Sequence, residues 1–70
     1  MNVENLINRL NWFYALEVTQ VDNYMSQANM IKDKFISQAL MRFASIEQVH
    51  ADNIATHIKR LGQEPTQIRN

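Results

Sequence analysis

The chain has 70 residues, of which seven are basic and seven acidic, and it contains no cysteine. This length allows one small domain, and the lack of cysteine excludes disulfides, iron–sulfur clusters and thiolate zinc sites. The balanced charge favours neither nucleic acid nor an anionic membrane, and no apolar run approaches the roughly 18–20 residues of a membrane span. We therefore expect a cytoplasmic protein with no nucleic-acid or membrane partner.

The first predicted helix covers residues 3–28. Asn2 is a good N-cap, and Glu4 places a negative charge in the first turn, where the helix dipole favours it. A stripe with alternating three- and four-residue spacing follows, and we expect it to face inward. The stripe consists of Leu6, Leu10, Phe13, Glu17, Gln20, Tyr24 and Gln27, widened by Ile7, Trp12, Leu16 and Val21.

A short connection at residues 29–32 is expected to lead into a second helix over residues 33–61, with Asp33 as its N-cap. No glycine marks this connection, so the residues alone also allow one helix that continues through residue 30. The single glycine and single proline of the chain both lie near its C-terminus, so few residues favour the turns that connect strands. The predicted fold class is all-α.

The second predicted helix ends at Leu61 and is followed by Gly62, the residue type that favours the C′ position, and Pro65 stops any continuation. Residues 63–70 are predicted to form a polar tail after a helical hairpin over residues 1–62. The inward stripe of the second helix consists of Ile36, Leu40, Phe43, Glu47, His50, Ile54, His57 or Ile58, and Leu61.

Within this stripe, Glu47 and His50 form a Glu-x-x-His pair. Residues three apart share one face of a helix, so both side chains can point at one metal ion. Their apolar neighbours Leu40, Phe43 and Ile54 predict that the pair faces a core rather than water. A carboxylate and an imidazole inside a core need compensation, and a metal ion is the leading explanation.

Glu17 lies near the middle of the first helix, as Glu47 lies near the middle of the second. Folding the chain at residues 29–32 brings the two acids to about the same level. The sequence therefore predicts Glu17, Glu47 and His50 as metal ligands. Hard carboxylate oxygens with imidazole suit iron or manganese better than soft ions, while zinc is a further candidate.

A two-helix hairpin covers only one side of each wide stripe, so aromatic side chains such as Trp12, Phe13, Phe35 and Phe43 would stay partly exposed. Two hairpins that pair into a four-helix bundle would cover them. Either the chain forms a homodimer or higher homo-oligomer, or it is the first half of a longer protein. Trp12, Phe13 and Phe43 are then core or interface residues.

A two-fold axis perpendicular to the helices would place both copies of Glu17, Glu47 and His50 in one central layer. This count matches the di-metal site of helical bundles, in which two helices each supply a Glu and two supply a Glu-x-x-His. Tyr24 and Gln20 share the face of Glu17 and are predicted to hydrogen-bond to the ligands, although a core amide fits Gln20 equally.

The role of His57 stays open, and the methionines have no predicted role in the site. His57, one heptad after His50, is a weaker candidate ligand, the alternative being a packed or partly exposed side chain. The four methionines are expected to fill gaps between larger side chains.

These residues resemble a known family. Glu17 followed seven residues later by Tyr24, then a connection and the segment 47–52, Glu-Gln-Val-His-Ala-Asp, is similar to the first half of rubrerythrin and bacterioferritin. The resemblance covers about residues 4–62. It implies a ferritin-like di-iron protein in which Glu17 is a terminal ligand, Glu47 bridges two irons and His50 is a terminal nitrogen ligand.

The resemblance implies an oxidoreductase that oxidises ferrous iron or reduces O₂ or hydrogen peroxide. The chain departs from the family in two ways: the second helix pair with its own ligands is missing, and so is the cysteine-rich electron-transfer domain of rubrerythrin. The first departure makes the site incomplete without a second chain. The second puts efficient peroxide reduction through that domain in doubt.

Two other functions fit the same residues. In the first, the chain is a non-catalytic helical interaction module, and Glu17, Glu47 and His50 form a buried polar network that sets the register of a dimer. In the second, the three residues bind zinc or manganese as a redox-silent structural site. Metal analysis of the purified protein separates these functions from a di-iron centre.

Overall fold

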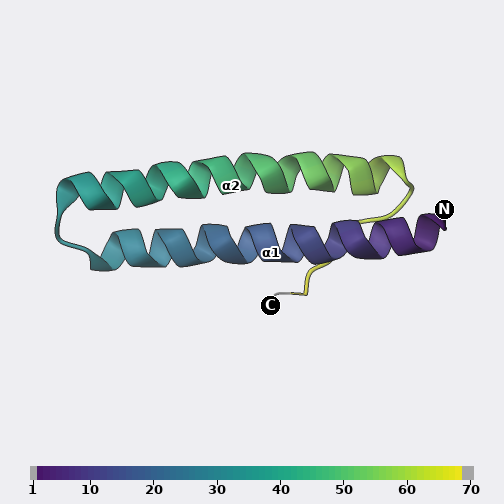
Figure 1. The fold of residues 1–70 in the computed structure, drawn as a ribbon, viewed down its shortest axis with the longest axis horizontal. Helices are drawn as coiled ribbons and strands as arrows, with labels where there is room; N and C mark the ends of the chain where they lie inside the picture. Colours follow the sequence, from purple (N-terminus) through teal and green to yellow (C-terminus); the bar gives the residue numbers. More distant parts are fainter. Residues whose placement is uncertain (1, 69–70) are drawn as a thin grey trace.

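The computed structural model describes residues 2–68, which form an antiparallel pair of helices (Figure 1). Helix α1 (Val3–Met30) and helix α2 (Lys34–Arg60) lie side by side along a body of 47 × 18 × 17 Å. The predicted helical hairpin is confirmed, and the described part of the chain contains no strand. Neither helix has a stretch long and apolar enough to cross a membrane.

The connection between the helices is shorter than the sequence analysis expects. Helix α1 continues to Met30, two residues beyond the predicted end, and Ile31 then takes an extended conformation with φ −89° and ψ 130°. The first helix therefore does continue through residue 30, as the alternative allowed, but it ends there, and a separate helix α2 begins at Lys34. The hydroxyl of Ser37 donates a hydrogen bond of 2.9 Å to the carbonyl of Ala28, which ties the first turn of α2 to the last turn of α1.

Both helices begin at the predicted N-caps. The Asn2 side chain accepts a hydrogen bond of 2.8 Å from the N–H of Glu4. The Asp33 carboxylate accepts bonds of 2.9 and 3.1 Å from the N–H groups of Phe35 and Ile36. These bonds satisfy N–H groups that have no partner within the helix, and each cap contributes about 1 kcal/mol to stability.

The seam between the helices is narrow because small side chains fill it. Ala28 of α1 is buried, as are Ala44, Ala51 and Ile58 of α2. With Ser37, the α2 members recur at a seven-residue spacing that keeps them on one side of the helix. Small residues at a contact allow two helix axes to approach closely.

The larger apolar residues predicted to face inward lie beside this seam. Phe13 is 48% exposed and Phe43 is 50% exposed, so the core of the single chain does not contain them. Trp12 is 56% exposed and is likewise outside that core, which confirms the prediction that these aromatic side chains stay partly exposed in a lone hairpin. The physical reason is that a two-helix hairpin has only one seam, and Ala28, Ala44, Ala51 and Ile58 occupy it.

We call the side that carries this stripe the open face. Contacts across it join the two helices: the rings of Tyr24 and Phe43 lie with their centroids 5.7 Å apart. The open face consists of Leu6, Phe13, Glu17, Gln20 and Tyr24 of α1, and Ile36, Leu40, Phe43, Glu47, His50, Ile54 and His57 of α2.

The segment after α2 folds back along α1. Gly62, with φ 87°, turns the chain in the left-handed conformation that glycine adopts without strain. The N–H of Thr66 then donates a hydrogen bond of 2.8 Å to the side-chain oxygen of Asn11. The predicted polar tail over residues 63–70 is therefore attached to α1 as far as it is described; residues 69–70, like Met1, lie outside the described part.

Candidate metal centre

Three side chains converge where the two helices are half-way along their length. They are Glu17, the 15th of the 28 residues of α1, with Glu47 and His50 near the middle of α2. One potential ligand atom from each lies within 4.8 Å of the other two. Among residues 2–68, these are the acids and histidines whose potential ligand atoms lie close enough together to bind one metal ion. They are the three ligands predicted from the sequence.

The two distances from the His50 imidazole to the carboxylates are longer than hydrogen bonds. The Nδ1 atom of His50 lies 3.7 Å from Oε2 of Glu17 and 3.7 Å from Oε1 of Glu47. Atoms in direct ligand contact with one small ion are separated from each other by about 3–4 Å, since carboxylate–metal and imidazole–metal bonds are about 2.0–2.2 Å long. The three atoms therefore surround a space of roughly the right size for one cation.

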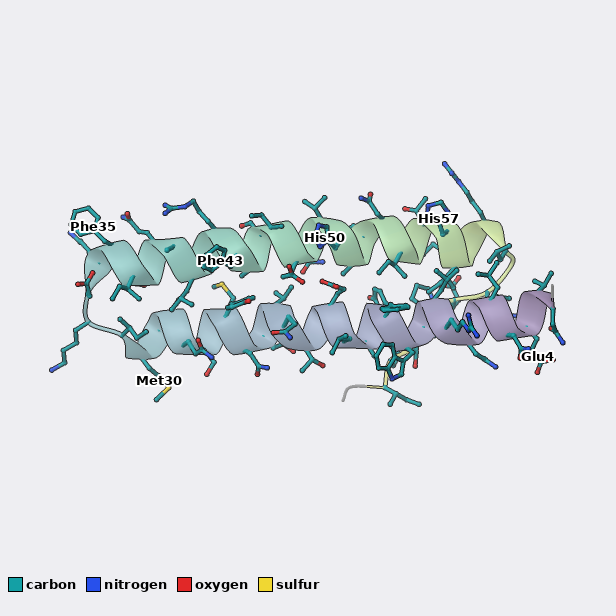
Figure 2. The ribbon with its side chains drawn as sticks, in the orientation of Figure 1. Glu4, Met30, Phe35, Phe43, His50 and His57 are labelled. Carbon is teal, nitrogen blue, oxygen red and sulfur yellow. The ribbon has the colours of Figure 1, made fainter. Side chains whose placement is uncertain are left out.

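The local structure explains the convergence. Glu47 and His50 are three residues apart and project from the same side of α2. Ala44 and Ala51, one turn before and after Glu47, keep α1 close at this level. Glu17 reaches the group from across the seam. Figure 2 shows His50 near the middle of α2, with Phe43 two turns before it and His57 two turns after it.

Glu17 carries the clearest electrostatic signature of the site. Hydrogen bonding with Glu47 raises the pKa of the Glu17 carboxyl, and burial and the negative charge of Glu47 raise it further, while nearby His50 lowers it. A proton shared with Glu47 stabilises the neutral acid. When both acids are ionised they repel each other at short range.

The Oε2 atom of Glu17 is buried and has no hydrogen-bond partner. A buried carboxylate oxygen without a partner is costly, and such groups in native proteins are normally paired or bound to an ion. A cation between Glu17, Glu47 and His50 would supply the missing partner and remove the repulsion. The donor set therefore fits a metal ion.

His50 is more exposed than the sequence analysis predicts. Its side chain is 53% exposed, against 21% for Glu17 and 24% for Glu47. The expectation that the pair faces a core is therefore wrong for His50 in the single chain. The reason is that His50 belongs to the open face, which no other part of the described chain covers.

The predicted supporting residues lie on the open face but do not contact the ligands by hydrogen bonds. Within the described chain, the Tyr24 hydroxyl makes no hydrogen bond to Glu17 or Glu47, and its ring packs against Phe43 instead. Gln20 is half-buried and likewise makes no hydrogen bond to the ligands. Their predicted role as hydrogen-bond donors to the ligands is not present in the single chain.

His57 lies too far along α2 to join the group. It follows Glu47 by ten residues, a helical distance of about 15 Å. It instead lines a hollow near the chain termini with Leu6, Leu10, Arg60 and Leu61. Leu6, Leu10 and Leu61 belong to the inward stripes predicted from the sequence, and His57 is an alternative member of the second stripe.

No protein-family model, curated protein or solved structure matches this chain. The functional assignment therefore rests on the residues and their geometry.

Proposed function

We propose that this chain forms a homodimer that binds two iron or manganese ions with Glu17, Glu47 and His50 of both copies. The observation that carries the proposal is the convergence of these ligand atoms on Oε2 of Glu17, a buried oxygen without a partner. Two carboxylates and one imidazole per chain form a hard donor set, which suits these metals.

The second copy is part of the proposal because one chain supplies only three donors. A metal ion at this position of the single chain would be open to solvent beside His50, whose side chain is half-exposed. A second hairpin packed on the open face would double the donor set and complete a four-helix bundle. We therefore propose a ferritin-like di-metal bundle built from two identical halves.

The proposed activity is oxidation of ferrous iron or reduction of O₂ or hydrogen peroxide. Iron ions bound between carboxylates would supply the electron-transfer chemistry. The chain itself contributes three effects. Glu17 and Glu47 provide negative charge that favours the oxidised metal, His50 provides a neutral nitrogen donor, and Phe13 and Phe43 exclude water once the open face is covered.

Glu17 links metal binding to the release of a proton. Its raised pKa means that, in the metal-free protein, this carboxyl keeps its proton to a higher pH than an ordinary glutamate does. Ligand binding requires the carboxylate, so metal binding releases the proton. Glu17 therefore couples metal uptake to pH.

A non-catalytic dimerisation module is the competing function. There, the three polar side chains would satisfy one another, as buried polar networks do. The 3.7 Å separations and the unpartnered oxygen of Glu17 favour a site that awaits a cation over a completed hydrogen-bond network.

Metal analysis tests the proposed function. Protein purified without chelator should contain two iron or manganese ions per dimer, and apo protein should take up ferrous iron in the same ratio. Glu47→Gln and His50→Ala should each remove stoichiometric binding. Gln48→Ala is the matched control, because Gln48 lies between the ligands in sequence but is exposed and hydrogen-bonded to Asp52. Retention of two ions per dimer by Glu47→Gln contradicts the assignment, and exclusive binding of zinc contradicts the redox activity.

A further inference from the structure

The open face has a hollow near the chain termini. Its volume is about 350 Å³, and it is lined by Leu6, Leu10, His57, Arg60 and Leu61. The lining is largely apolar, and Leu6 and His57 belong to the open face. The hollow is open to solvent in the single chain, so its apolar lining is left uncovered there.

The opposite end of the open face carries a projecting apolar side chain, Ile36, which is 50% exposed. Its neighbour Phe35 is 84% exposed and points away from α1, and Met30 points outward on the other side of the hairpin (Figure 2). Ile36 is therefore the large side chain of this end of α2 that lies on the same face as the metal ligands.

Ile36 and the hollow lie at equal distances from the candidate metal centre. Ile36 precedes Glu47 by 11 residues, Leu6 precedes Glu17 by 11 residues, and His57 follows Glu47 by ten. At about 1.5 Å per residue, both lie about 16 Å from the centre, in opposite directions along the hairpin. This symmetry follows from the position of Glu17 and Glu47 at the middle of their helices.

We infer that two copies pair antiparallel across the open face, so that Ile36 of each copy enters the hollow of the other. This inference rests on the proposed function and specifies its assembly. A two-fold axis through the metal centre and perpendicular to the helices brings Ile36 to the level of the partner's His57. The same operation places one Ile36 side chain in each hollow.

The antiparallel pairing also covers the exposed ligand. Phe43 precedes Glu47 by four residues and His50 follows it by three, so the axis brings Phe43 of one copy to the level of the partner's His50. Phe43 is 50% exposed in the single chain. The partner's phenyl ring thus lies beside the imidazole and removes both side chains from water.

A parallel pairing about an axis along the helices is the alternative. It would also join two metal centres, since Glu17 and Glu47 lie at the same level. However, it places hollow against hollow and Ile36 away from both of them. Two unfilled hollows would remain at one end, which is unfavourable for packing. The shape of the open face therefore selects the antiparallel pairing.

Disulfide cross-linking distinguishes the two pairings, because the described chain contains no cysteine that would interfere. Ile36→Cys protein is mixed with His57→Cys protein, loaded with ferrous iron, and oxidised mildly. Positions 36 and 57 of one helix are about 31 Å apart, far beyond the roughly 7 Å that a disulfide allows between Cα atoms, so any link joins two copies. We expect a covalent heterodimer in high yield.

A second mixture, Ile36→Cys with Gln27→Cys, tests the parallel pairing, in which position 36 faces the partner's residue 27. Links between 36 and 27 with two metal ions per dimer overturn the antiparallel pairing and leave the proposed metal function intact. A monomer by light scattering, with no link in either mixture, overturns both.

Substitution of Ile36 gives a test independent of cysteine chemistry. Ile36→Lys should weaken dimerisation by at least about tenfold, since it places a positive charge in a largely apolar hollow that Arg60 borders. Phe35→Lys is the matched control: it introduces the same charge one residue away, at an exposed position outside the open face. Equal effects of the two substitutions contradict the entry of Ile36 into the hollow.

Discussion

The Nδ1 atom of His50 lies 3.7 Å from the Oε2 atom of Glu17, and that oxygen is buried without a hydrogen-bond partner. The two groups come from different helices and approach without bonding. Their separation leaves a space bordered by a third group, Glu47. The stability and the metal binding of the protein should therefore respond in opposite directions to changes at Glu17.

Replacement of Glu17 by Gln tests this opposition. The amide removes the repulsion from Glu47 and can donate a hydrogen bond to it, so we expect the metal-free protein to gain up to about 1 kcal/mol of unfolding free energy. Metal-dependent stabilisation should be lost at the same time. Urea unfolding at one fixed protein concentration, with and without ferrous iron, measures both effects.

Asp22→Asn is the control for Glu17→Gln, because it removes the same charge from an exposed position of α1. It should change neither quantity by more than about 0.5 kcal/mol. A Glu17→Gln protein that is less stable without metal and still stabilised by iron contradicts the assignment.

The pKa of Glu17 predicts how the stability of the metal-free protein depends on pH. Because the folded chain raises this pKa above its ordinary 4.5, the folded state binds more protons than the unfolded state in the window that begins near pH 4.5. The unfolding free energy should therefore fall as pH rises through this window, and its Glu17 contribution is most favourable below it. Denaturant unfolding between pH 4 and about pH 7 measures the slope.

In the Glu17→Gln variant the slope contributed by this residue should vanish. Iron binding should release protons in the same window, which calorimetry in buffers of different ionisation enthalpy detects. An unchanged slope in the variant would show that another group causes the pH dependence.

Removal of metal should destabilise the protein by mass action. A metal present at 100 times its dissociation constant stabilises the folded state by about 2.7 kcal/mol, so a chelator should lower the melting temperature by several degrees. His50→Ala should melt at the same temperature with and without chelator. Gln48→Ala should respond as the natural chain does, and an equal chelator response in His50→Ala argues against His50 as a ligand.

The alanine seam should control the geometry of the metal centre. Ala51 is fully buried, so Ala51→Leu would push α2 away from α1 at the level of the ligands. We expect a loss of about 1–3 kcal/mol in stability and weaker metal binding. Gln38→Leu adds the same side chain at an exposed position of α2 and should leave both unchanged. Thermal unfolding and iron titration of the two variants provide the comparison.

The hydrogen bond between Asn11 and Thr66 should hold the C-terminal segment on α1. Asn11→Ala removes the acceptor of this 2.8 Å bond, and we expect a loss of about 1 kcal/mol together with faster proteolysis within residues 63–68. Asn23→Ala is a control at an exposed position of the same helix. Equal cleavage rates in the two variants contradict an anchoring role for this bond.

Sequence patterns predicted the parts of this structure that depend on local chemistry. Asn2 and Asp33 are N-caps because their side chains reach N–H groups two residues ahead. The convergence of Glu17 with Glu47 and His50 follows from equal helix lengths on either side of a short connection. Each of these features needs only helical periodicity and residue type.

The seam and the C-terminal segment were not predictable in the same way. A count of large apolar residues favours the stripe of Phe13 and Phe43, whereas close packing of two helices favours the smaller Ala44 and Ala51. A side-chain oxygen that binds a backbone N–H 55 residues away leaves no periodic trace. His50 is exposed because it lies outside the seam, and residues outside the seam face solvent in a lone hairpin.

The half-exposed imidazole of His50 has a consequence for how an assembled site would behave in a cell. If each hairpin carries half of the donors, formation of the complete centre is second order in the chain. At low abundance the protein would hold metal weakly and release it, and as the chain accumulates its capacity would rise more steeply than its amount. Because the open face must be covered by a second chain, the fraction of the protein that retains metal would rise with the concentration of the protein.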